Sequence, residues 1–215
     1  MKLSKDIKAP LLNVSNYGIK LSWGSMEWEN FHFQTENAFH INRIEDYVRL
    51  SKLAELPLPP HRKEVFDFIF LTNGKTVRSK SVESYEFSKN QFFFLLGYQI
   101  TTMQSMTADA CGYYCHFNSD IFYNKLFQKE LLLQFPFLHF TGNPIVEIDA
   151  KAAAFTIHLI KRLELAYRSG EKCNFDFVAS TLLTLFFEIK PFARSISSIT
   201  DNSAYRIANE YKKLW

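Results

Sequence analysis

Residues 61–74 have the sequence HRKEVFDFIFLTNG, and this stretch decides the fold class. Its centre, residues 64–72, is rich in β-branched and aromatic residues and contains neither glycine nor proline. Such a composition favours a β-strand. The dipeptide Asn73-Gly74 follows directly, and this pair readily adopts the positive φ angles of a two-residue hairpin turn. The stretch therefore predicts a strand that ends in a hairpin.

More short strands are predicted on both sides of this stretch. On the C-terminal side they comprise residues 76–78, 84–87, 91–96, 99–106 and 112–117. Residues 31–48 are expected to add strands on the N-terminal side. Many short strands separated by turns are typical of a sandwich or barrel.

The hydrophobic pattern becomes helical after about residue 150. Residues 151–168 predict a first helix, with Phe155, Leu159, Leu163 and Ala166 near one face. A second helix is expected to be capped by Asp176 and stopped by Pro191. It is apolar nearly all round, so it is either deeply buried or part of an oligomer interface. Residues 204–215 predict a third helix with an apolar stripe.

The composition is that of a globular protein: hydrophobic residues make up 47% and charged residues 22%. The 22 phenylalanines allow a large aromatic core, and the formal net charge of +3 is too small to indicate a nucleic-acid surface. Cys111, Cys115 and Cys173 have no disulfide spacing, so we interpret them as thiols in a reducing cytosol. The N-terminus lacks an apolar stretch of signal-peptide length, and no apolar run could span a bilayer. A cytoplasmic location is expected, without membrane partners.

The pattern His61-x-Lys63-x3-Asp67-x6-Gly74 resembles the first cupin motif. In metal-dependent cupins that motif supplies two histidines and a glutamate, and a later histidine completes the set around a divalent metal. Here Lys63 stands for the second histidine, and its ammonium has no lone pair to donate. Thr101 stands near the position of the last histidine. The sequence therefore predicts no metal, no cofactor and no catalytic residue.

Several segments, in order, are similar to the N-terminal domain of AraC-family transcription regulators. They are residues 56–62 (LPLPPHR), 66–74, 85–94 (YEFSKNQFFF), 99–100 (QI) and 112–122 (GYYCHFNSDIF). Gly97 and Tyr98 depart from the family pattern, which has Pro and Gly there. The resemblance implies a barrel that binds a small effector, and helices that form a homodimer. It also implies a helix-turn-helix domain that binds promoter DNA, which lies outside these 215 residues.

The predicted fold class is α+β: a cupin-like antiparallel β-barrel of the jelly-roll, or double-stranded β-helix, type, followed by α-helices. Residues 1–145 would form an N-terminal arm and the barrel, and residues 146–195 the helical dimerisation segment. Residues 196–215 would form a linker and the first helix of a truncated DNA-binding domain.

The candidate site residues fall into two groups. For the effector they are His61, Phe66, Phe68, Phe70, Gln99, Thr101, Met103, Tyr114 and His116. For dimerisation they are Phe155, Leu159, Leu182, Leu185, Phe186 and Ile189. Phenylalanines at alternate strand positions are also what a plain core would contain.

Two other functions stay open at this point. A metal-dependent cupin enzyme, an isomerase or a dioxygenase, would use His61 and Asp67, and metal analysis would reveal it. A stand-alone cupin-like binding protein would use the helices only to close its core. A reading frame that continues past Trp215 into two helix-turn-helix units would separate the regulator from the stand-alone protein.

Overall fold

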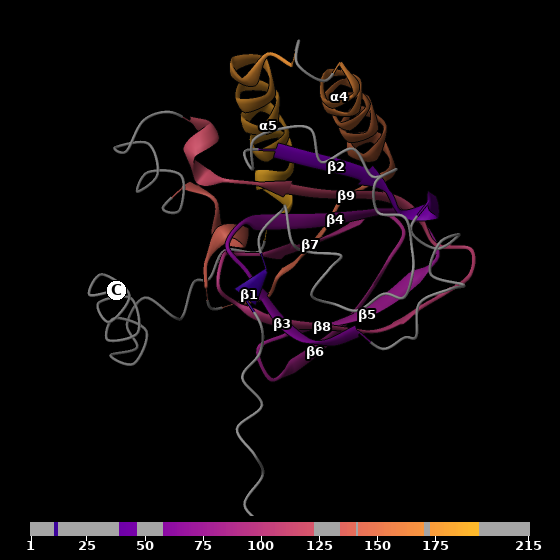
Figure 1. Cartoon of the computed structure of the whole chain (residues 1–215). Helices are drawn as coiled ribbons and strands as arrows, with labels where there is room; N and C mark the ends of the chain where they lie inside the picture. Colours follow the sequence, from indigo (N-terminus) through magenta and orange to yellow (C-terminus); the bar gives the residue numbers. More distant parts are fainter. Residues whose placement is uncertain are drawn as a thin grey trace, which may run out of the picture.

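The computed structural model describes residues 11–12, 39–46, 58–122, 134–140, 142–169 and 173–193 (Figure 1). The strands are β1 (Leu11–Leu12), β2 (Phe39–Arg43), β3 (Leu58–Lys63), β4 (Phe66–Asn73), β5 (Lys75–Lys80), β6 (Glu83–Ser88), β7 (Gln91–Leu95), β8 (Ile100–Met106), β9 (Cys111–Phe117) and β10 (Ile145–Glu147). The helices are α4 (Ala150–Arg168) and α5 (Phe175–Ile189), with 3-10 turns η2 (Ser119–Phe122), η3 (Pro136–Leu138) and η5 (Lys190–Phe192). The third predicted helix and segment 196–215 lie outside the described residues.

The strands form two five-stranded sheets. Sheet A has the order β1-β3-β8-β5-β6, and sheet B has the order β10-β7-β4-β9-β2. Every pairing is antiparallel except that of β1 with β3. Figure 1 shows three layers, with α4 and α5 over one side of sheet B and sheet A on its other side. The α+β prediction is confirmed, although the described strands form two separate sheets and no closed barrel.

The turn after the deciding strand differs from its prediction. All five strands expected between residues 76 and 117 are present as β5 to β9, but β4 belongs to sheet B and β5 to sheet A. Asn73-Gly74 is therefore a corner between the sheets, and the predicted hairpin is wrong. Gly74 has a φ of +75°, and a Cβ there would lie 2.5 Å from the backbone of Ala110. The corner needs glycine for both reasons.

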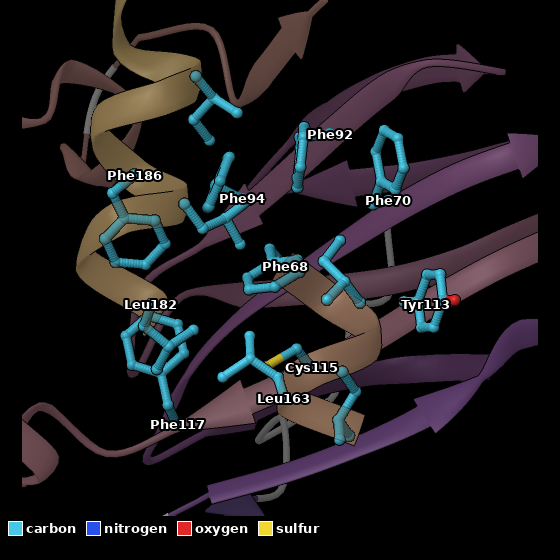
Figure 2. Packing of buried hydrophobic residues seen from close by; sticks show 14 of the residues in the cluster. Phe68, Phe70, Phe92, Phe94, Tyr113, Cys115, Phe117, Leu163, Leu182 and Phe186 are labelled. Atoms are coloured by element: carbon cyan, nitrogen blue, oxygen red, sulfur yellow. The ribbon is translucent and has the colours of Figure 1, made fainter. Parts of the chain in front are cut away.

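Sheet B is buried on both faces, and alternate residues of its strands serve different layers. Toward the helices it presents Phe68, Phe70, Phe92, Phe94, Tyr113, Cys115 and Phe117, which pack on Leu163, Leu182 and Phe186 (Figure 2). Toward sheet A it presents Ile69, Leu71, Phe93 and Leu95, which pack with Phe87. The period of two along a strand produces this division.

The helices begin and pack somewhat differently from the sequence prediction. Helix α5 is capped by Asn174, whose Oδ1 accepts from the Phe177 amide at 3.0 Å, so the predicted cap Asp176 is wrong. Helix α4 is capped by Asp149 and buries a face that contains Ile160, Leu163 and Tyr167, while Phe155 is exposed. No helix among the described residues is long and apolar enough to cross a membrane.

Candidate functional site

A cluster of buried polar side chains lies between the two sheets. We call it the inter-sheet polar cluster; it comprises His61, Lys63, Asp67, Arg78, Tyr114 and His116. Strands β3 and β5 of sheet A supply three of these residues, and strands β4 and β9 of sheet B supply the other three. Five of the six are almost fully removed from water, and Tyr114 is partly buried. Such burial requires each charge to be compensated locally.

An ion pair between the sheets forms the centre of the cluster. Lys63 Nζ donates hydrogen bonds to Asp67 Oδ2 and to the hydroxyl of Tyr114. That hydroxyl also lies 3.4 Å from Asp67 Oδ2. The Arg78 guanidinium lies 5.6 Å from the centre of the Tyr114 ring, and Lys63 Nζ lies 4.9 Å from it. Because Lys63 and Asp67 are only 3% and 1% exposed, each charge is compensated by the other rather than by water.

Two histidines continue the cluster toward the edge of sheet B. The ring of His116 meets the Tyr114 ring edge-on at a centroid distance of 4.3 Å, and the His40 ring at 5.8 Å. Burial holds the pKa of His116 well below its usual range, and the neighbouring Lys63 cation adds to that effect. Burial lowers the pKa of His40 to about 4. Both imidazoles are therefore neutral near pH 7.

Three other effector candidates are buried in sheet A or beside it. Gln99 accepts from the Leu96 amide at 2.9 Å and donates to the Phe140 carbonyl at 2.7 Å. Thr101 donates to the Ser79 carbonyl at 2.7 Å, and Met103 is buried. Gln99 and Thr101 thus have backbone partners.

The predicted phenylalanines of the effector site lie on the helix side of sheet B, away from the inter-sheet polar cluster. Phe68 and Phe70 are fully buried against the helices, and Phe66 packs on the same core. The residues of β4 that alternate with them, beginning with Asp67, face sheet A. The strand is apolar on both faces, so its alternation could not tell which face met the helices. The charged Asp67, the second residue of the strand, was the available signal.

Four predicted dimerisation residues belong to the core of the chain. Leu182, Leu185, Phe186 and Ile189 have no exposed surface, because they pack on sheet B and on α4. They cannot contact a second subunit without unfolding α5. In contrast, Phe155 on α4 is 58% exposed, and Leu159 is partly buried. Leu165, which was not among the predicted dimerisation residues, is 65% exposed on the same helix.

The cluster does not fit a divalent metal, although it occupies the cupin motif positions. The Lys63 ammonium takes the place of one histidine and binds the carboxylate of Asp67 that would serve as a ligand. Thr101, in place of the last histidine, is bonded to the backbone. Within the described ranges, no three histidine, cysteine or acidic side chains are grouped so that they could hold a metal ion.

Comparisons with known proteins give distant structural similarities. No family model matches the chain, and no curated protein matches it. The chain is similar to the AraC-like transcriptional activator CuxR, with 14% identity, a TM-score of 0.42, and coverage of 82% of this chain and 57% of that one. The chain is also similar to ToxT from Vibrio cholerae, with 12% identity, a TM-score of 0.38, and coverage of 82% of this chain and 65% of that one. The similarity to oxalate decarboxylase from Bacillus subtilis has 12% identity and a TM-score of 0.26, and it covers 54% of this chain and 39% of that one. The chain spans less than two thirds of each of these structures, and such values do not assign a family.

Breaking the buried ion pair should cost far more than replacing both of its members. We expect Lys63→Met to lower the free energy of unfolding by about 3–5 kcal/mol, because it leaves the Asp67 carboxylate buried without a cation. The double variant Lys63→Met/Asp67→Val should recover most of that loss. Denaturant unfolding measures both. The exposed pair Lys75–Glu86, with 3.4 Å between its charged atoms, is the matched control, and Lys75→Met should cost less than about 1 kcal/mol. A double variant less stable than Lys63→Met would contradict this account.

The neutral buried histidines should make the fold sensitive to acid. The pKa of His40 is about 4 in the folded chain and 6.5 in the unfolded chain, so only the unfolded chain gains this proton between those values. The free energy of unfolding should therefore fall as pH drops through this window, by up to about 1.4 kcal/mol per pH unit for each such histidine. Denaturant unfolding between about pH 7 and pH 5 measures the slope. His40→Gln should flatten it, and the exposed His158→Gln should not. Equal slopes in all three proteins would refute the assignment.

Proposed function

We propose that this chain is the ligand-sensing and dimerisation domain of an AraC-type transcription regulator. In this proposal the promoter is bound by a helix-turn-helix domain outside these 215 residues. The inter-sheet polar cluster contacts a small effector, and the helical segment joins two subunits. No catalytic role is proposed for any residue.

The observation that carries the proposal is the coincidence of the regulator-like sequence segments with the strands around the cluster. Residues 56–62 lead into β3, residues 66–74 cover β4, residues 85–94 extend from β6 into β7, and residues 112–122 cover most of β9. Strands β3, β4 and β9 carry five of the six cluster residues. The resemblance and the buried polar chemistry thus fall on the same elements.

The cluster is chemically suited to recognition. An effector between the sheets would meet the donors of Lys63 and Arg78, the hydroxyl of Tyr114 and the neutral imidazole of His116. Ligand sites in proteins commonly combine an apolar surround with a few polar groups that fix orientation. Here Ile69, Leu71 and Phe93 supply apolar surface on the same side of sheet B. Of the original effector candidates, His61, Tyr114 and His116 keep this role in the proposal.

The alternative of a metal-dependent cupin enzyme is disfavoured by the chemistry of the side chains. His61 and Asp67 were its expected ligands, and the Asp67 carboxylate is bound by the Lys63 ammonium. A metal there would have to displace the buried Lys63 ammonium from the Asp67 carboxylate. A binding role uses the same residues without that displacement.

Dimerisation is assigned to the outer face of α4. Phe155 and Leu165 are large apolar residues exposed on one side of this helix, in contrast to the inward-facing Leu182 and Phe186 of α5. Exposed apolar side chains on a regular element are a common feature of subunit interfaces. A second copy that covers both residues would remove them from water.

The dimer proposal predicts that charges on α4 separate the subunits without unfolding them. We expect the wild-type chain to dimerise at micromolar concentrations, and Phe155→Glu/Leu165→Glu to raise the dissociation constant at least about tenfold. The melting temperature should change little, because both sites are exposed. Sedimentation velocity measures the association.

Val82→Glu is the control for the added charge, since Val82 is 97% exposed in the turn between β5 and β6. It should leave the dissociation constant unchanged. Leu182→Glu should instead unfold the chain, because Leu182 is buried. A wild-type chain that stays monomeric at high micromolar concentration would refute the assignment of a dimerisation domain.

A further inference from the structure

Side chains at the C-terminal end of α4 contact β2 at the edge of sheet B. Among the described residues β2 is the last strand of this sheet, and it alternates in the same way as β4. Phe39 and Ile41 join the core on the helix side, whereas His40 pairs across the strand with His116 of the inter-sheet polar cluster. The ring of Tyr167, from the last turn of α4, lies 6.0 Å from the Phe39 ring and 5.1 Å from the His40 ring. One side chain of α4 therefore contacts residues from both sides of sheet B.

A defined hydrogen bond joins Tyr167 to the inner side of the sheet. The Asn42 amide donates to Nε2 of His40 at 2.8 Å. Burial keeps His40 neutral, so Nε2 acts as an acceptor and the ring proton resides on Nδ1. Nδ1 then donates to the Tyr167 hydroxyl, with 2.6 Å between the two atoms. Both ring nitrogens of His40 are engaged, and this fixes the orientation of the ring.

From His40 a continuous row of side chains leads back to the ion pair. The His40 ring lies 5.8 Å from the His116 ring, and the His116 ring lies 4.3 Å from the ring of Tyr114. The Tyr114 hydroxyl accepts a hydrogen bond from Lys63 on the opposite sheet. Each member of the row touches the next, so a displacement at one end has to be accommodated along it.

A second contact fixes the same end of α4 to the same strand. Arg43 Nε donates to Glu164 at 3.0 Å, and Arg43 Nη2 donates to it at 2.7 Å. Arg168 also binds Glu164, at 2.8 Å. Glu164 precedes Tyr167 by three residues, so the two contacts of α4 with β2 lie about one helical turn apart. The end of α4 is therefore joined to β2 by two separate polar contacts.

We propose that the row Tyr114–His116–His40–Tyr167 couples the inter-sheet polar cluster to the C-terminal end of α4. A change in the Lys63–Asp67 pair repositions Tyr114 and His116, and the His40–Tyr167 hydrogen bond passes that change to the helix. In the regulator this row would link effector binding to the helix that carries Phe155 and Leu165. That last role rests on the proposed function, whereas the coupling itself does not.

Hydrogen–deuterium exchange of α4 amides, in a double-mutant cycle, tests the coupling. Tyr114→Phe and Tyr167→Phe each remove one hydroxyl and keep the ring. We expect Tyr114→Phe to accelerate exchange in residues 163–168 at least about twofold relative to α5. In the Tyr167→Phe background the same substitution should produce no further acceleration, because the link is already broken.

Two further variants make the outcome decisive. Thr101→Val removes a buried hydroxyl bonded to the Ser79 carbonyl within sheet A. It should not change the amide exchange rates of α4 relative to those of α5. Lys63→Met/Asp67→Val is a stronger perturbation of the cluster. It should accelerate amide exchange at the end of α4 only when the Tyr167 hydroxyl is present. The proposal is overturned if the cluster variants accelerate amide exchange in α4 equally with and without the Tyr167 hydroxyl. It is also overturned if neither Tyr114→Phe nor Lys63→Met/Asp67→Val changes that exchange. The cycle needs neither effector nor DNA, so its failure would leave the dimer experiment and the proposed function standing.

Discussion

Burial of sheet B on both faces is the constraint on which the rest of the structure depends. A strand covered on both sides has no position for a charge that faces water, yet β4 contains Asp67 at its second residue. The free energy of burying a lone carboxylate is prohibitive, so the opposite sheet has to supply a cation. Lys63 is that cation, and its bond to Tyr114 ties a third strand into the same contact. The pair and its contact with Tyr114 thereby join one strand of sheet A to two strands of sheet B.

The same constraint divides the aromatic residues into two cores. The rings on the helix side of sheet B contact those of α5 and η3, as in the 4.4 Å approach of Phe94 to Phe137. The rings on the other side form a smaller group, in which Phe87 stacks on Phe93 at 5.0 Å. The inter-sheet polar cluster belongs to this second layer, and the edge strand β2 joins it to α4 through His40 and Tyr167. Position at the sheet edge, rather than proximity in sequence, thus gives His40 its place in the row.

The sequence predicts the strands better than it predicts their faces. Aromatic and β-branched runs between turns correctly located β4 to β9, because local composition reports strand formation directly. Local composition could not show which alternate residues of β4 face the helices, because the centre of the strand, residues 68–71, is apolar at every position. Helix α5 is apolar nearly all round, which fits either a core or an interface. Most of its apolar residues are buried in the core, whereas Phe187 is 52% exposed. The His40–Tyr167 bond joins residues 127 positions apart, and no local pattern encodes such a contact.

Metal content after loading tests the central claim most directly, namely that the pairing of Lys63 with Asp67 makes the inter-sheet polar cluster unfit to bind a divalent metal. The purified chain would be incubated with Mn²⁺, Fe²⁺ or Zn²⁺, desalted, and analysed by inductively coupled plasma mass spectrometry, with His61→Ala treated in parallel. The account predicts far less than about one metal ion per chain, with no difference between the two proteins. Close to one ion per chain, lost on His61→Ala, would contradict it and would favour a metal-dependent enzyme.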